Sequence, residues 1–132
     1  MKRTLTVATQ KEKELRDITS AVQAELARAS FRDGILMLFV PHTTCAITIN
    51  ENADPDVCTD LVYALKKAFP QHTAFQHIEG NSDAHVMTSL TGSSELLMVE
   101  NGQLVLGTWQ GIYLAEYDGP RERKIHLKFI AS

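Results

Sequence analysis

Three of the five histidines stand where a fold can present a side chain to a ligand. His42 directly follows an apolar run in PHTTCA, and His77 and His85 flank the polar stretch HIEGNSDAH. Loops beside strand and helix ends commonly carry functional groups. Three converging imidazoles would suit Zn²⁺ or a similar divalent ion with one open coordination position. The alternative is that each ring bonds only to local backbone, because the chain has no HxxxH or CxxC spacing.

Carboxylates lie close to these histidines in the sequence. Glu51 follows a predicted strand in NENADPD, and Asp83 precedes His85 in EGNSDAH. A carboxylate at a strand end can orient a histidine, bind a metal ion or transfer a proton. A solvated loop acid is the alternative for Glu51, whereas helix capping explains Asp54 and is an option for Asp83.

Hydroxyl groups and cations add a possible anion site. Thr43–Thr44 and, later, Thr88–Ser89 and Ser93–Ser94 could hold phosphate oxygens together with backbone N–H groups at a helix start. Three cations, Arg121, Arg123 and Lys124, follow the Gly119-Pro120 turn, where a solvated loop is the alternative. The chain has no Walker loop and no GxGxxG, so a phosphate site would be of another kind.

The elements that must position these groups follow from hydrophobic periodicity. Asp54 and Pro55 predict a capped helix start, Ser20 and Gln23 predict a capping box, and Asn101-Gly102 predicts a hairpin turn. We predict helices at 19–29, 55–69 and 84–92, and strands at 4–7, 15–18, 35–40, 45–49, 95–100, 103–107, 111–117 and 124–130. This pattern indicates an α+β fold with a largely antiparallel sheet or sandwich core and helices packed on one face.

Composition limits the classes of function. The chain of 132 residues predicts one domain, residues 1–132, and a net charge of −3 gives no general attraction to nucleic acid or acidic membranes. No apolar run approaches the length of a membrane span, and we expect no signal peptide. Two cysteines, Cys45 and Cys58, favour a reduced, cytoplasmic protein, and we interpret both as buried packing residues.

Three stretches, PHTTCAITINENADPDV, GNSDAH and LGTWQGIYLAEYDGPR, together resemble the YjbQ family of small proteins, often labelled secondary thiamine-phosphate synthase. The resemblance spans nearly the whole chain and implies a β-sandwich-like α+β fold assembled as a homotrimer. The positions that match are His42, Thr43, Asn50, Glu51, His77, Asp83, His85, Trp109, Gln110, Gly111, Glu116 and Arg121. Met87 departs from the family, which commonly has lysine there, so a phosphate would need another cation.

The activity that this resemblance implies joins a pyrimidine-methyl diphosphate to a thiazole phosphate and releases pyrophosphate. Such a reaction needs a divalent cation and donors to the leaving group. For catalysis we name Glu51, His42 and His85, and for a metal His42, His77 and His85. For binding of a small phosphorylated metabolite we name Thr43, Asn50, Asp83, Ser89, Trp109, Gln110 and Arg121.

Two other functions stay open. Mg²⁺ prefers oxygen ligands, so a three-histidine site favours Zn²⁺ and a metal-assisted hydrolase of a small phosphorylated or cyclic substrate. The other alternative is a non-catalytic trimer that binds a small anion or metabolite.

Trp109 lies between Gly107 and Gly111, an arrangement typical of crowded backbone. Packing at a subunit boundary is our first interpretation of the indole, and stacking on a flat ligand ring is the alternative.

Overall fold

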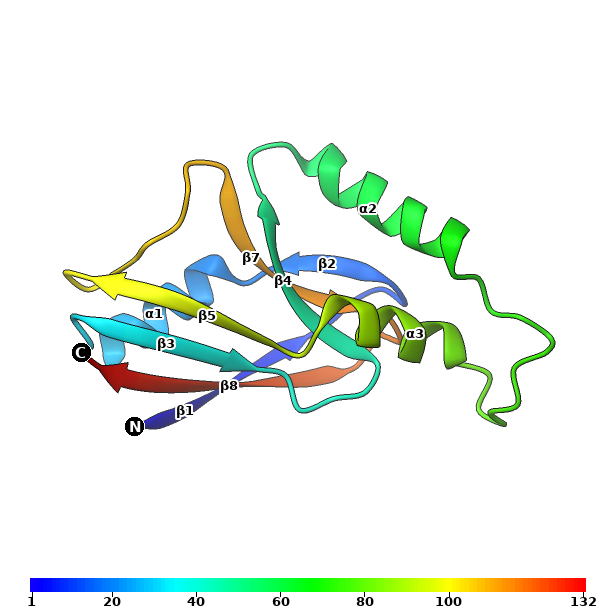
Figure 1. The fold of residues 1–132 in the computed structure, drawn as a ribbon, viewed down its shortest axis with the longest axis horizontal. Helices are drawn as coiled ribbons and strands as arrows, with labels where there is room; N and C mark the ends of the chain where they lie inside the picture. Colours follow the sequence, from blue (N-terminus) through cyan, green and yellow to red (C-terminus); the bar gives the residue numbers. More distant parts are fainter.

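Two antiparallel sheets share the main apolar core of the protein (Figure 1). The structure is a computed structural model that describes all 132 residues. The five-stranded sheet has the order β1 (Lys2–Ala8), β8 (Glu122–Ala131), β3 (Gly34–Phe39), β5 (Ser94–Glu100) and β6 (Gln103–Leu104). The three-stranded sheet has the order β2 (Glu14–Asp17), β7 (Gln110–Glu116) and β4 (Cys45–Glu51). The predicted α+β class is therefore confirmed.

Strict alternation along β8 shows how the core forms. Ile125, Leu127 and Phe129 point inward and are buried, while the residues between them face outward. They meet apolar side chains of β3 and β7 and of the helix α1 (Thr19–Arg28), whose Val22 and Leu26 are fully buried. One face of each sheet is thereby removed from water.

The start of α1 differs from the predicted capping box. The Asp17 carboxylate accepts from both the backbone N–H and the hydroxyl of Thr19, at 2.9 and 2.6 Å. Gln23 instead donates to the Gly102 carbonyl at 2.9 Å and accepts from the Leu104 N–H. The Ser20–Gln23 box is therefore wrong, because Gln23 is used to tie α1 to the β5–β6 hairpin.

The other two helices lie on the side of the three-stranded sheet (Figure 1). In α2 (Pro55–Ala68), Asp54 accepts from the Asp56 N–H at 2.9 Å, so the predicted cap is confirmed. No residue of α2 is buried, whereas α3 (Ser82–Thr91) packs on β4 and ends at Gly92, with φ +102°. None of the three helices has the length and apolar character needed to cross a membrane.

The predicted hairpin turn is also confirmed. Asn101 and Gly102 have φ of +52° and +75°, the left-handed conformations that a two-residue turn of this kind requires. The turn pairs Val99 with Leu104 and starts the connection that leads to Trp109 and β7.

Candidate functional site

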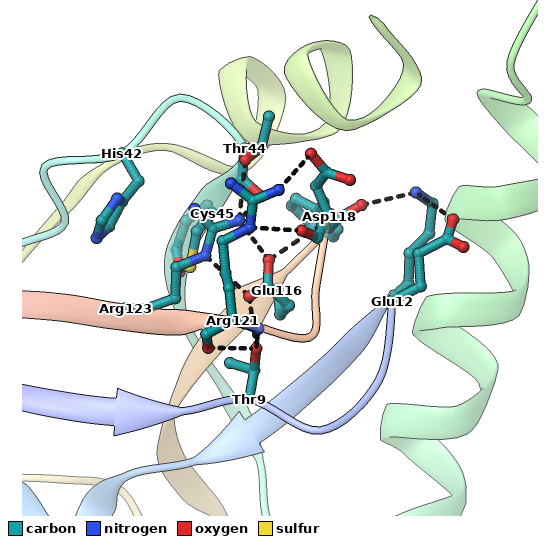
Figure 2. Close-up of polar contacts among 12 residues, drawn as sticks. Thr9, Glu12, His42, Thr44, Cys45, Glu116, Asp118, Arg121 and Arg123 are labelled. Carbon is teal, nitrogen blue, oxygen red and sulfur yellow. Dashed lines mark hydrogen bonds and ion pairs between the residues drawn. The ribbon is translucent and has the colours of Figure 1, made fainter. Parts of the chain in front are cut away.

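An ion pair is buried where β4, β7 and β8 come together (Figure 2). The Arg123 Nε donates to Glu116 Oε1 at 2.8 Å, and its Nη2 donates to the Thr44 hydroxyl at 2.9 Å. Thr9 donates to the same carboxylate at 2.7 Å. Glu116 and Arg123 are 0% and 2% exposed, so the pair must be well hydrogen-bonded to exist there.

Charge complementarity holds Glu116 ionised. Burial alone would raise the pKa of Glu116, but hydrogen bonds from Arg123, Thr9 and the Asp118 N–H outweigh it and lower that pKa. Burial correspondingly opposes the charge of Arg123, yet Glu116 raises the pKa of the guanidinium. The two groups are therefore both charged near pH 7, and the residues around them lie on this buried ion pair.

Further polar contacts surround the Arg123–Glu116 ion pair. Arg121 Nη2 donates to Asp118 Oδ2 at 3.0 Å, and Asn81 Nδ2 donates to the same oxygen at 2.9 Å. The Arg121 side chain remains half-exposed, while Lys13 and Asp83 form a largely buried pair at 3.0 Å. The three quoted sequence stretches thus meet at one place, which they reach from the β3–β4 loop, the start of α3 and the β7–β8 turn.

His42 lies at the edge of this cluster (Figure 2). Its Nε2 accepts a hydrogen bond from the Lys124 backbone N–H at 2.9 Å. Burial lowers the pKa of His42, and the positive charges of Arg123 and Arg121 lower it further against the opposing effect of Glu116. The ring is therefore neutral near pH 7.

The other two predicted metal ligands lie beside one another. His77 and His85 have ring centroids 5.3 Å apart with the rings at 88°. Glu79 lies 3.9 Å from His77 Nε2. No group of three or more His, Cys, Asp or Glu side chains in the chain is arranged to hold a metal ion. His42, His77 and His85 therefore do not form one metal site within this single chain, and a metal ion bound by these residues stays a prediction.

Four predicted residues lie at the opposite end of the β4–β7 pair. Cys45 pairs with Glu116 at one end and Glu51 pairs with Gln110 at the other. Six residue steps of extended strand separate these ends by about 20 Å. Asn50 accepts from the Glu51 N–H, Gln110 accepts from the Gly107 N–H, and Trp109 is 63% exposed. One chain therefore keeps this group away from His42 and Arg121.

The remaining predicted residues are placed as follows. Thr43 is exposed in the β3–β4 loop. Ser89 is exposed in the last turn of α3, so it is not at a helix start. Met87 is fully buried against Ala46 and Ala115, so it supplies core packing.

The cysteines also differ from one another. Cys45 is fully buried, as predicted, and burial raises its thiol pKa to about 12, so it is not a thiolate nucleophile. Cys58 is only half-buried, contrary to the prediction, because α2 covers little of the sheet.

Sequence reasoning missed the burial of Arg123, because both readings of the cationic run, an anion site and a solvated loop, place its side chain at the surface. The signal was present, because Arg123 has the same inward parity on β8 as Ile125 and Leu127. Its partner Thr44, and Thr9 on the same Glu116 carboxylate, are distant in sequence, so only the fold shows that they meet.

Comparison of the sequence with known proteins identifies a family and several relatives. Residues 3–132 match the family described as UPF0047 protein YjbQ-like. The UPF0047 protein YugU of Bacillus subtilis is 46% identical over 98% of this chain and 99% of its own length, and a UPF0047 protein of Methanocaldococcus jannaschii is 47% identical over 94% and 90%.

Solved structures agree with these sequence matches. An uncharacterised protein of the YjbQ/UPF0047 family from Clostridium acetobutylicum superposes with a TM-score of 0.93 at 48% identity, covering 97% of this chain and 99% of that one. A hypothetical protein from Aeropyrum pernix K1 gives 0.94 at 33% identity, covering 100% and 99%.

Proposed function

Because the chain belongs to the UPF0047 YjbQ-like family, we propose that it binds a small phosphorylated metabolite in a site shared between copies of the chain. The leading reaction is thiamine-phosphate synthesis, in the cytoplasm, by a homotrimer. The observation that carries the proposal is the meeting of the three family-like stretches at the Arg123–Glu116 cluster.

The chemistry of this cluster suits a phosphate group. Arg121 presents a half-exposed guanidinium, of which Asp118 occupies only part, and Thr43 is an exposed residue next to Thr44 in the β3–β4 loop. Guanidinium groups bind phosphate oxygens through strong, directional hydrogen bonds. The buried pair beneath holds the β7–β8 turn in place, which is the preorganisation that a binding site needs.

A second copy would complete the site. Glu51 and Trp109 lie about 20 Å from the cluster along β4 and β7, too far for one small ligand to contact both groups within a chain. The indole of Trp109 is exposed and offers a flat surface for a pyrimidine or thiazole ring. We infer that the Trp109 end of one copy faces the Arg121 end of its neighbour.

Exposed apolar side chains support an oligomer. Ile35, Leu96, Met98 and Ile130 are each at least 42% exposed. The register puts Ile35 beside both Met98 and Ile130, so these side chains form one patch on the outer face of the five-stranded sheet. Patches of this kind commonly mark interfaces between proteins.

Complementation between two inactive variants tests the shared site. His42→Ala and Trp109→Ala should each reduce formation of thiamine phosphate from the two phosphorylated precursors by tenfold or more. Refolding the two variants together should restore roughly one site in four, as random mixing in a closed ring of subunits predicts.

Three outcomes would argue against parts of the proposal. No gain on mixing would mean that both residues serve one chain or neither serves the site. Binding of thiamine phosphate by calorimetry without turnover would favour the non-catalytic trimer. Absence of both binding and turnover in the wild type would overturn the proposed function.

The His77–His85 pair favours a second candidate, a metal-assisted hydrolase. The two rings lie at right angles and could supply two ligands, with a third from another copy. Stoichiometric Zn²⁺ that is lost in His77→Ala and retained in His72→Ala would favour it, and a metal-free wild type that still binds thiamine phosphate would count against it.

A further inference from the structure

The backbone N–H of Lys124 lies just beyond the end of a strand pairing. Phe39, the last residue of β3, pairs with His126, and the same register would place Pro41 opposite Lys124. The chain instead leaves the sheet there, so the Lys124 N–H has no strand partner on this side. His42 replaces that partner, because its Nε2 accepts from the Lys124 N–H at 2.9 Å.

This contact determines where the imidazole carries its proton. A backbone N–H only donates, so Nε2 must offer its lone pair. A neutral imidazole with an acceptor at Nε2 carries its proton at Nδ1. No group of the chain accepts from Nδ1, so the ring presents one free N–H donor whose direction is fixed by the sheet.

The surroundings of the ring favour an anionic partner. The charged and titratable neighbours of the ring include two cations, Arg121 and Arg123, and the imidazole of His126. The one carboxylate among them, Glu116, is already neutralised by Arg123. An anion near His42 would thus meet donors and net positive charge. A cation there would meet repulsion and no free lone pair.

We propose that His42 is a fixed hydrogen-bond donor, which gives its Nδ1–H to a phosphate oxygen of the bound metabolite and binds neither a metal ion nor a transferred proton at Nε2. This role rests on the proposed function and assigns one contact within it. His42 is then a specificity residue for the anionic group, positioned by the backbone of β8.

Nitrogen-15 NMR of the histidine rings tests the proton position without any ligand. At pH 7.5 the wild type should show His42 protonated at Nδ1 alone, and adding inorganic phosphate or thiamine phosphate should shift that Nδ1–H signal. Proton at Nε2, a doubly protonated ring, or Nε2 coordinated to a metal ion in the purified protein would each overturn the proposal.

Substitutions test the donor in binding. His42→Gln keeps an acceptor for Lys124 and a donor for the ligand, so it should bind thiamine phosphate within about threefold of the wild type. His42→Met keeps the bulk but has no donor, and it should weaken binding by about 10- to 100-fold, the range for a hydrogen bond to a charged group. His72→Ala serves as the control and should bind normally, because the His72 ring is exposed and contacts only the Ala74 N–H and Phe75.

The possible results distinguish a failure of the donor role from a failure of the proposed function. If thiamine phosphate binds the wild type but His42→Met binds equally well, or the Nδ1–H signal does not move, the donor role is wrong and the shared site survives. If His42→Gln is as weak as His42→Met while both unfold like the wild type, the ring acts in another way and the donor role is again wrong. If nothing binds the wild type, both fail.

Discussion

The opposite charges of Arg123 and Glu116 neutralise one another at a buried position, where either charge without its partner would be strongly destabilising. Replacing Arg123 with Met should destabilise the fold by about 3–5 kcal/mol, because the Glu116 carboxylate would remain buried without its main partner. Urea unfolding at pH 7 measures the loss. The double variant Arg123→Met with Glu116→Leu removes both charges and should recover much of it. Equal losses in the single and double variants would contradict this account.

The same pair predicts a dependence on pH. The pKa of Glu116 is lowered in the folded protein, so its contribution to stability is present above the ordinary glutamate pKa of about 4.3 and is lost as pH falls below it. In Arg123→Met the folded pKa of Glu116 should instead be raised by burial. The difference in unfolding free energy between variant and wild type should therefore shrink as pH falls toward 4, and a constant difference would count against the mechanism.

At the residue level, local signals in the sequence predicted local contacts. Asp54 with Pro55 predicted a helix start, since both act on neighbouring backbone. The Ser20–Gln23 box failed because Gln23 has a better partner 79 residues away, at Gly102. The contact of His42 with the Lys124 N–H was not predictable for the same reason, since the two residues are 82 positions apart.

The β4–β7 pair depends on a glycine at position 111. A Cβ on Gly111 would lie only 2.5–2.8 Å from side-chain atoms of Asn52. Gly111→Ala should therefore cost about 1–3 kcal/mol, the usual range for overpacking, and urea unfolding measures it. Gly107→Ala is the matched control, because a Cβ there would meet the flexible Gln110 side chain at 3.3–3.6 Å, and it should cost far less.

A second change checks the cause of that strain. Asn52→Gly removes the side chain that a Cβ at position 111 would meet, so it should make Gly111→Ala nearly neutral in its own background. If the cost of Gly111→Ala is unchanged there, crowding by Asn52 is not the reason for glycine at this position.

At the element level, periodicity predicted most strands and all three helices, because alternation along β8 and helical spacing in α2 are properties of single segments. The split into two sheets was not predictable in the same way. It depends on which strands pair, and β1 with β8 joins the two ends of the chain. The family resemblance, which rests on the order of three motifs, is confirmed.

At the level of the whole molecule, the role of Trp109 depends on whether a neighbouring copy of the chain covers its side chain. The side chain is 63% exposed in a single chain, so Trp109→Ala should change the stability of an isolated chain by no more than about 0.5 kcal/mol. If the indole is instead covered by a neighbouring copy, its loss should cost the assembly about 3–5 kcal/mol, the range for deleting a buried large aromatic. Trp109→Ala should then sediment partly as a 14.7 kDa species at micromolar concentration, while the wild type stays trimeric.

The control is Tyr63→Ala, which removes an equally exposed aromatic side chain on α2 and should remain trimeric. A wild type that sediments only as a single chain would remove the shared site altogether. An intact Trp109→Ala trimer that no longer binds thiamine phosphate would show that the indole contacts the ligand and that other surfaces, such as the Leu96 and Met98 patch, hold the copies together.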